Sequence, residues 1–245
     1  MKNLIKQINL YQKEHKAISK ELKNAPKGYL VKRGKRYAQR IGKKEMGITT
    51  LLHQIKALCR KRYLLARQEQ LQQLLATPLD KVAKLTLLMP QALIATFPQA
   101  YQNLPISYFY HPKIQPWLDH PHQQNDHPTG SNHYTKNGIT FRSKSEMIIA
   151  GHLDAYGLIY KTDIAQNFTT GTTYPDFVIK NPFTNKTVLW EHFGLMGHPK
   201  YEQRMNEKLD LYLTHGYTDQ TLIYTFESHI KNEKRIQKFI EAILL

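Results

Sequence analysis

The stretch that decides the fold is residues 174–193, YPDFVIKNPFTNKTVLWEHF. Its two ends, 174–180 and 187–193, are rich in β-branched and aromatic residues, which favour strands. The six residues between them, NPFTNK, are typical of a turn. The pattern therefore predicts two neighbouring antiparallel strands joined by a short connection.

The expected pairing of these strands brings two acidic residues together. If the turn is symmetric about Phe183 and Thr184, the numbers of paired residues add up to 367, and Asp176 lies opposite Glu191. Directly opposed side chains have Cβ atoms roughly 5 Å apart. Two carboxylates so close repel each other, and their apolar neighbours indicate burial, so a divalent cation with oxygen ligands is the natural partner.

The surrounding sequence predicts further helices and strands in a regular order. The segment 143–156 has helical spacing, and Gly157 suits the residue after a helix end. The other expected elements are a strand at 158–163, a helix at 199–215 that ends at Gly216, a strand at 221–226, and a closing helix capped by Ser228. The order is αβββαβ followed by one helix.

Glu146 lies in the first turn of the expected helix 143–156. The pair Ser143 and Glu146 has the spacing of a capping box, in which each side chain satisfies a backbone N–H at the helix start. Spacing alone leaves capping and metal binding equally open for Glu146.

Three short motifs, FRSKSE (141–146), YPDF (174–177) and WEHFG (190–194), resemble the PD-(D/E)xK nuclease superfamily in their joint order and spacing. The resemblance covers residues 134–245. It implies a restriction-endonuclease-like αβββαβ core that hydrolyses phosphodiester bonds with Mg2+ or Mn2+. It also implies a set of metal ligands: Asp176, Glu191, Glu146 (directly or through water) and the backbone carbonyl of His192.

The chain departs from the family pattern at one position. The family has a lysine two residues after the last acidic residue, where this chain has Phe193. Lys208 on the next helix is one replacement, because Lys208 and Tyr212 share a helical face and resemble the Gln-x-x-x-Tyr element of the exonuclease-like branch. Lys161 or Lys144 is a second option, and a catalytically impaired domain is a third.

Positive charge is concentrated in the first part of the chain. Residues 1–100 hold 21 basic and 5 acidic side chains, whereas residues 101–245 hold 14 of each, so the net charge of +16 arises entirely from the first 100 residues. Such asymmetry usually marks a segment that binds a polyanion, and a solubilising surface is the alternative.

The sequence 29–41 reads as a basic β-hairpin within this mostly helical region. Basic side chains can contact phosphates, while interleaved tyrosines can stack on bases or pack beneath the strands. The predicted nucleic-acid-binding residues are Lys32, Arg33, Lys35, Arg36 and Arg40 in the hairpin, Arg142 and Lys144 beside the acidic residues, and Tyr212.

The remaining N-terminal elements are expected to be helices. A narrow apolar seam through residues 1–22 predicts a helix that packs within the chain or forms a homodimer. A long helix is expected at 49–76, with shorter ones near 79–89 and 91–97. The long helix is expected to bury Leu51, Leu52, Ile55, Leu58 and Leu65, while Arg60, Lys61, Arg62 and Arg67 extend the basic surface.

The predicted organisation has three parts: a basic region 1–100, a connector 101–133 rich in proline and histidine, and the nuclease-like domain 134–245. Trp117 is expected to pack within the connector. Its histidines could join Asp126 in a zinc site, although they lack the spacing of a closed Cys/His site.

No long apolar run suggests a membrane span or a secretion signal, and the single cysteine excludes an intramolecular disulfide, so a cytoplasmic location without membrane contact is expected. The leading hypothesis is a nuclease whose basic N-terminal region binds DNA, with RNA left open. A protein of nuclease fold that binds nucleic acid without cleaving it, and an N-terminal module for protein interaction, are the alternatives.

Overall fold

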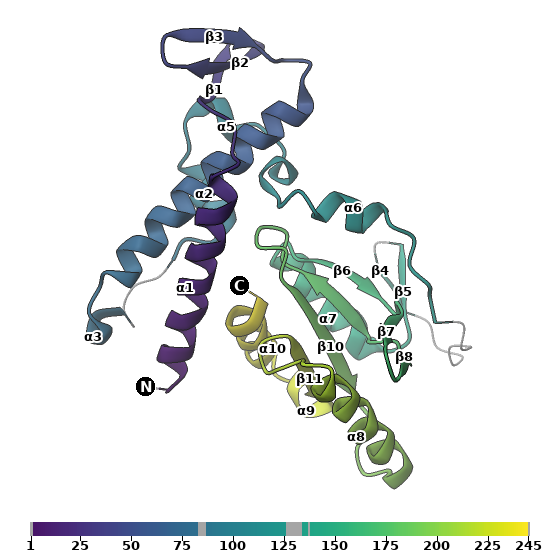
Figure 1. Ribbon diagram of the computed structural model, residues 1–245. Coiled ribbons are helices and arrows are strands. Elements are labelled where there is room, and N and C mark those ends of the chain that lie inside the picture. Colours follow the sequence, from purple (N-terminus) through teal and green to yellow (C-terminus); the bar gives the residue numbers. More distant parts are fainter. Residues whose placement is uncertain (1, 83–86, 126–133, 137, 245) are drawn as a thin grey trace. The chain divides into compact units, whose positions relative to one another are not determined.

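The computed structural model describes residues 2–82, 87–125, 134–136 and 138–244 (Figure 1). It is a mixed α+β structure with helices and several small sheets. The chain divides into two compact units, Met1–His111 (unit 1) and Pro112–Leu245 (unit 2). The division falls inside the predicted connector 101–133.

Unit 1 contains two long helices, a three-stranded sheet and several short helices. The long helices are α1 (Lys2–Leu22) and α2 (Leu52–Leu75), and the sheet consists of β1 (Tyr29–Arg33), β2 (Arg36–Ile41) and β3 (Lys44–Gly47) in that order. The short helices are α3 (Leu79–Val82), α4 (Pro90–Ala95), α5 (Gln99–Gln102) and the 3-10 helix η1 (Ile106–Phe109).

Helix α1 packs along α2, so the apolar seam predicted for residues 1–22 packs within the chain. Two ion pairs join the helices: Arg60 lies 2.9 Å from Glu21, and Arg67 lies 2.8 Å from Glu14. Both arginines are buried, which corrects the expectation that they extend a basic surface. Carboxylates far away in the sequence neutralise them, and this pairing is invisible in the sequence of α2 itself.

The buried face of α2 also differs from the predicted one. Ile55 and Leu58 are buried as expected, whereas Leu51, Leu52 and Leu65 are exposed. The buried face instead includes a set of residues that helical periodicity places beside Ile55 and Leu58: Cys59, Tyr63, Leu64, Leu71 and Leu74.

The predicted hairpin is present, with β1 and β2 paired antiparallel from Tyr29 opposite Arg40 to Arg33 opposite Arg36. Strand β3, which the sequence did not predict, pairs with β2. It brings Glu45 between two hairpin cations: its carboxylate accepts hydrogen bonds from Arg33 (2.7 Å) and from Arg40 (2.7 Å).

Unit 2 is built around a four-stranded sheet. The sheet has the order β11 (Leu222–Phe226), β10 (Thr187–Phe193), β9 (Phe177–Lys180) and β6 (Ile159–Thr162). Strands β10 and β11 are parallel, and the other neighbours are antiparallel. Its helices are α6 (Ile114–Asp119), α7 (Lys144–Ala155), α8 (Pro199–Thr214), α9 (Glu227–Ile230), α10 (Glu233–Phe239) and the π-helix η2 (Ile240–Leu244).

The sequence missed two small hairpins in unit 2. These are β4 (Tyr134–Lys136) with β5 (Ile139–Phe141), and β7 (Gln166–Phe168) with β8 (Gly171–Thr173). The second hairpin lies between β6 and β9. From α7 onward, and without these hairpins and the closing helices, the order is α7, β6, β9, β10, α8, β11, as predicted.

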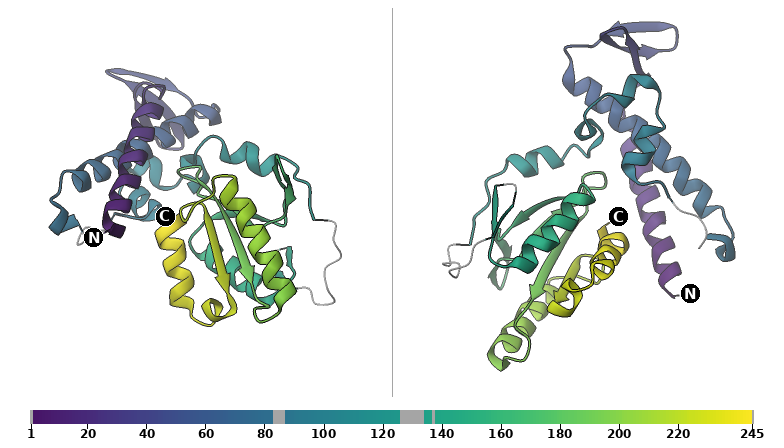
Figure 2. Two further views of the ribbon diagram at one scale, coloured as in Figure 1. Left: turned by 60° about the horizontal axis from the view of Figure 1, so that its bottom comes forward. Right: turned by 180° about the vertical axis from the view of Figure 1, so that it is seen from behind.

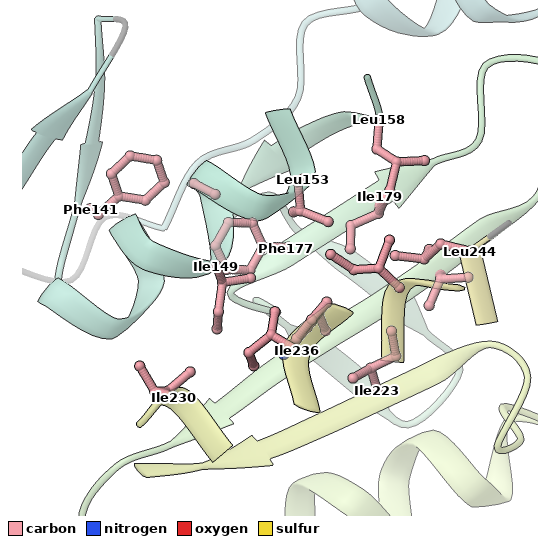
Figure 3. Close-up of a cluster of buried hydrophobic side chains, with 14 residues drawn as sticks. Phe141, Ile149, Leu153, Leu158, Phe177, Ile179, Ile223, Ile230, Ile236 and Leu244 are labelled. Atoms are coloured by element: carbon pink, nitrogen blue, oxygen red, sulfur yellow. The ribbon is translucent and has the colours of Figure 1, made fainter. Parts of the chain in front are cut away.

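Alternation along the strands gives the sheet two buried faces. Phe177, Ile179 and Trp190 pack with α7, α10 and η2 in the larger core (Figure 3). Val178 and Leu189 point to the opposite face, where they pack against residues of α8 such as Tyr212. The sheet therefore lies between α8 and the pair α7 and α10 (Figure 2).

The closing helix differs from the single helix capped by Ser228. The structure begins α9 at Glu227, with Phe226 before it, and separates α9 from α10 at Asn232. The backbone N–H of Phe226 donates to Nδ1 of His229 (2.9 Å), so a histidine satisfies the amide at this helix start. Asn232 is extended and therefore interrupts the helical path.

The predicted connector is divided between the two units. Tyr101 and Phe109 are buried in unit 1, whereas Trp117 packs in unit 2 with the ammonium groups of Lys161 (5.0 Å) and Lys180 (5.6 Å) over its ring. Asp126 and the histidines at 127 and 133, which were considered for zinc, lie outside the described residues.

Within the described ranges, every helix is either too short or too polar to form a transmembrane span.

We expect the Arg67–Glu14 ion pair to be essential for the stability of unit 1. Replacing Arg67→Met leaves the Glu14 carboxylate without its partner, and we expect a loss of about 3 kcal/mol in the free energy of unfolding. The double change Arg67→Met with Glu14→Leu should recover most of this loss. Circular dichroism during denaturation measures it, with the exposed Lys13→Met on α1 as control. A double variant no more stable than Arg67→Met alone would contradict this account.

Candidate functional site

Asp176 and Glu191 lie side by side at the end of the paired strands β9 and β10. The ladder runs from Thr187 opposite Lys180 to Trp190 opposite Phe177, which is the predicted register. Strand β9 begins at Phe177, later than the predicted strand 174–180, so Asp176 lies just beyond the ladder. There its carboxylate accepts the His192 N–H and interacts electrostatically with Glu191. Glu191 and Asp176 are both buried, with exposed fractions of 2% and 7%.

A third acidic residue, Asp163, continues this row and was not predicted. Strand β6 pairs with β9 so that Thr162 lies opposite Phe177, and Asp163 and Asp176 are the residues just beyond this pair. Their carboxylates interact electrostatically and share the guanidinium of Arg142. Asp163 has a positive φ of 50°, so the chain turns at this point. The sequence does show an aspartate directly after a predicted strand. Placing that aspartate beside Asp176 would have required knowing how β6 pairs with β9.

Glu191 is held by two side chains from α8. The ammonium group of Lys208 lies 2.8 Å from the carboxylate and also donates to the backbone carbonyl of Tyr174 (2.9 Å). The hydroxyl of Tyr212, four residues later on the same helical face, donates to the other side of the Glu191 carboxylate. The structure thus brings Lys208 to the acidic residues, the first of the options for the lysine missing at 193.

Tyr212 has no exposed surface. This corrects the expectation that it contacts nucleic acid, because an enclosed ring cannot stack on a base. Its function in the structure is to hold Glu191 from the α8 side, where Phe168 and Tyr217 also pack against its ring. Burial, followed by the negative charge of Glu191 and the hydrogen bond to it, raises the pKa of the Tyr212 hydroxyl.

Asp176 is held by Arg142 and by the backbone of β10. Arg142 donates to Asp176 Oδ1 (2.9 Å), and the N–H of His192 donates to Oδ2 (2.6 Å). Arg142 also lies 2.7 Å from Asp163 Oδ1, at an angle outside hydrogen-bond geometry. Arg142 therefore places one permanent positive charge between two carboxylates.

Glu146 serves as a helix cap and also lies beside the acidic row. Its backbone N–H donates to Ser143 Oγ (3.1 Å), so Ser143 caps α7 as the sequence predicted. The Glu146 carboxylate accepts hydrogen bonds from the Ser143 hydroxyl (2.9 Å) and from the backbone N–H of Arg142 (3.0 Å). The same carboxylate interacts electrostatically with Asp176, so the capping position and the acidic row coincide.

Burial changes the protonation of this group of carboxyls. Burial, followed by repulsion from Asp176, raises the pKa of Glu191 to about 7 and that of Glu146 to about 7. Burial likewise raises the pKa of Asp163, against the effect of Arg142. The cations of Arg142 and Lys208 thus offset only part of the cost of burying several carboxylates together.

His192 presents its backbone and its side chain to different surroundings. Its N–H points to Asp176, and the N–H and C=O of one strand residue face the same edge, so its carbonyl faces the β9 edge. The imidazole instead contacts Thr225 Oγ1 (3.1 Å) and Glu227 (3.3 Å). This agrees with the expectation that the imidazole packs on the face opposite Glu191.

The other two candidate lysines are placed differently. The Lys161 ammonium donates to the carbonyls of Leu118 (3.1 Å) and His120 (3.0 Å), so it fastens residues 118–120 to β6 and does not reach Glu191. Lys144 is exposed in the first turn of α7. Among the described residues, Lys208 is the lysine that contacts the acidic row.

The hairpin cations of unit 1 are only partly available. Arg33 and Arg40 share the carboxylate of Glu45, and Lys32 lies 5.8 Å from the centre of the Tyr37 ring. Lys35 and Arg36 are exposed at the turn.

The carboxyl groups form no ready-made metal site. Within the described part of the chain, no group of three or more His, Cys, Asp or Glu side chains has the arrangement of a ligand set. Instead, Arg142 and Lys208 act as internal counter-ions. The arrangement places several carboxylate oxygens and one lysine close together. Either cations or protons must balance the negative charge of these carboxylates.

Comparisons with known proteins add little to this geometry. No protein-family model matches the chain, and no solved structure matches it significantly. An uncharacterized protein from Methanocaldococcus jannaschii is 24% identical over 124 residues, a match that covers 44% of this chain and 10% of that protein. The chain thus spans about a tenth of the length of this curated relative.

The raised pKa values predict how unit 2 responds to pH in the absence of metal. Between about pH 4.5 and pH 7 the folded state holds protons on Glu146 and Glu191 that the unfolded chain releases, so stability falls as pH rises. Glu191→Gln should reduce the fall between about pH 5 and pH 8 by on the order of 3 kcal/mol. Both tryptophans, Trp117 and Trp190, lie in unit 2, so urea unfolding followed by tryptophan fluorescence in EDTA measures it.

The exposed Glu207→Gln on α8 is the matched control and should leave the pH profile unchanged. Parallel profiles for wild type and Glu191→Gln would contradict the raised pKa of Glu191.

Proposed function

We propose that unit 2 is a metal-dependent nuclease domain of the PD-(D/E)xK superfamily, with a restriction-endonuclease-like core, that hydrolyses phosphodiester bonds, with DNA as the expected substrate. The observation that carries the proposal is the buried pair of Asp176, directly before β9, and Glu191 on the neighbouring strand β10, with Lys208 Nζ 2.8 Å from Glu191. Burying carboxylates together costs stability, so a function that needs them accounts for their position.

The donor set suits a hard divalent cation. Asp176, Glu191 and Glu146 offer carboxylate oxygens, and the His192 carbonyl faces the same strand edge as Asp176. Oxygen ligands of this kind fit Mg2+ or Mn2+. When bound, such an ion would lower the pKa of a coordinated water and offset negative charge on the phosphate.

Lys208 is proposed to do the work of the lysine that the family has at position 193. Residues 191 and 193 point to the same face of β10, and this face packs against α8. Phe193 fills its position by packing on Tyr201 and Phe226. A lysine projecting from α8 therefore reaches the same side of Glu191, where its ammonium group can orient a water and stabilise charge on the phosphate.

Arg142 is the second cation of the site. Its guanidinium is shared by Asp176 and Asp163 and stays charged at every accessible pH. A cation bound by Asp176 would compete with Arg142 for the same oxygen, Oδ1. We propose that Arg142 then pairs with Asp163 and with a substrate phosphate.

A second candidate function is nucleic-acid binding without cleavage. The observation that favours it is that Arg142 and Lys208 already neutralise Asp176 and Glu191, and that the described residues hold no preformed three-residue ligand set. Phe193 at the position of the family's lysine points the same way. Metal-dependent cleavage separates the two functions.

The cleavage test uses purified full-length chain with plasmid and linear DNA, and with RNA, in Mg2+ or Mn2+. We expect Asp176→Asn and Glu191→Gln each to reduce the cleavage rate at least 100-fold, by analogy with the loss of a stabilising group in other active sites. Lys208→Ala should reduce it by a similar factor, with partial recovery in Lys208→Arg. The exposed Lys200→Ala, also on α8, should cleave at the wild-type rate.

Equal rates in wild type, Asp176→Asn and Glu191→Gln would show that any cleavage arises elsewhere or from a contaminant. Salt-sensitive DNA binding without cleavage in any metal would favour the second function.

Metal binding is expected to raise the unfolding temperature of unit 2 even without substrate. A ligand that binds only the folded state stabilises it by RT ln(1 + [L]/Kd). The shift with Mn2+ should be larger near pH 8 than near pH 6, because the ion must displace the protons of Glu191 and Glu146, whose pKa values are about 7.

Asp176→Asn should lose the shift, and the exposed Glu207→Gln should keep it. A shift of the same size in wild type and Asp176→Asn would place the metal elsewhere. Tryptophan fluorescence follows the transition.

A further inference from the structure

Unit 1 contains a cavity of about 530 Å³ that none of the sequence motifs indicates. Its walls come from three segments: residues 28–33 with Arg40 of the hairpin, the middle of α2, and residues 98–101. Its size falls within the range of roughly 300–1,000 Å³ of small-molecule sites. The hydroxyl of Tyr101 accepts a hydrogen bond from the backbone N–H of Leu30 (3.0 Å), and this bond holds the segment 98–101 against β1.

The charged part of the lining is entirely basic. It consists of Lys32, Arg33, Arg40, Lys61 and Arg62, and none of the described residues that line the cavity is acidic. The single carboxylate of Glu45 is shared by Arg33 and Arg40, so one positive charge of that group is left over. The Lys61 ammonium donates hydrogen bonds to the backbone carbonyls of Pro26 (2.8 Å) and Gly28 (2.9 Å). Both carbonyls are neutral, so these bonds do not cancel the positive charge of Lys61.

Arg62 is the cation best placed to bind an anion. Its guanidinium lies over the Phe97 ring, 4.9 Å from the centre, and forms no ion pair with a described residue. Its Nε is buried without a hydrogen-bond partner among the described residues. A buried N–H of this kind costs stability unless a ligand satisfies it.

The remaining lining is apolar and aromatic. The apolar lining residues include Leu58, Leu65, Pro98 and Tyr101. Leu65 on α2 is exposed. Tyr29 also lines the cavity and is 49% exposed, so its ring is accessible to a ligand. A free phosphate would contact only the cations of the lining, and an apolar ligand would contact only its apolar residues, so neither ligand uses the whole lining. A nucleotide offers both a phosphate and a flat ring that stacks on an aromatic side chain.

We propose that this cavity binds one unpaired nucleotide of a nucleic acid strand, with Tyr29 stacking on the base and Arg62 binding the phosphate. The inference rests on the proposed function, because it specifies the substrate as nucleic acid with a single-stranded segment or end. A base within a duplex is stacked and paired and cannot enter a cavity of this size. Arg33 and Arg40 at the edge of the cavity contribute positive charge for the adjoining backbone.

The test measures binding without cleavage. Fluorescence anisotropy in EDTA compares a labelled 12-nucleotide single strand with the blunt duplex of the same sequence, using the full chain. We expect Tyr29→Ala to weaken single-strand binding about 10-fold, as stacking losses of 1–3 kcal/mol per base imply. Arg62→Ala should weaken it as well, because the phosphate loses its cation, and both variants should change duplex binding by less than about 2-fold. Tyr29→Phe keeps the ring and removes only the hydroxyl, which hydrogen-bonds with Arg40, so it should retain most of the single-strand binding.

The exposed Lys44→Ala on β3 removes a charge outside the cavity and should weaken both ligands alike. Circular dichroism establishes that each variant is folded. Since Arg62 also packs on Phe97, Arg62→Gln provides a second variant that keeps part of the side chain.

Equal losses for single strand and duplex in Tyr29→Ala, or no loss for either, would overturn the inference. The result is separable from the proposed function, since binding is measured in EDTA, where no metal-dependent cleavage takes place. Selective single-strand binding without any cleavage would contradict the nuclease proposal and support the nucleotide-binding cavity. Metal-dependent cleavage together with wild-type single-strand binding by Tyr29→Ala would support the nuclease proposal and contradict the nucleotide-binding cavity.

Discussion

The antiparallel pairing of β9 with β10 is the constraint on which unit 2 depends. A register shift by one residue would turn Asp176 and Glu191 toward opposite faces of the sheet, because side chains alternate along a strand. It would also remove the N–H of His192 from Asp176. The observed register puts Phe177 and Trp190 into the larger core and both carboxylates on the α8 side, so apolar packing and the position of the acidic pair are selected together.

Burying these carboxylates sets an electrostatic requirement that other elements meet. Arg142, just before α7, pairs with Asp176, and Lys208 from α8 pairs with Glu191. The compensation is incomplete, since burial still raises the pKa of Glu191 to about 7. Packing and hydrogen bonds elsewhere in unit 2 must offset this cost. Such a balance is typical of sites where another cation shares the same oxygens, and it links the stability of the fold to the proposed function.

The parts of unit 2 that the sequence predicted correctly depend on local information. A short turn between two apolar runs determined the register of β9 with β10, which brings Asp176 beside Glu191, and helical spacing placed Lys208 beside Tyr212. Asp163 was missed because its position depends on the pairing of β6 with β9, between which the chain forms the β7–β8 hairpin. The restriction-endonuclease-like core and the three-part division of the chain stay predictions, since they depend on information beyond the order of elements.

The basic character of unit 1 shows a different limit of sequence reasoning. Counting residues treats every cation as available, yet Arg60 and Arg67 are buried in ion pairs, and Arg33 and Arg40 share Glu45. A buried cation that is already paired releases no counter-ions from nucleic acid, so it contributes nothing to the dependence of binding on salt. The number of basic residues therefore overstates the electrostatic part of any binding by unit 1. The proposed binding of nucleic acid by unit 1 would depend on cations that have no carboxylate partner among the described residues, and Arg62 beside the cavity is one of these.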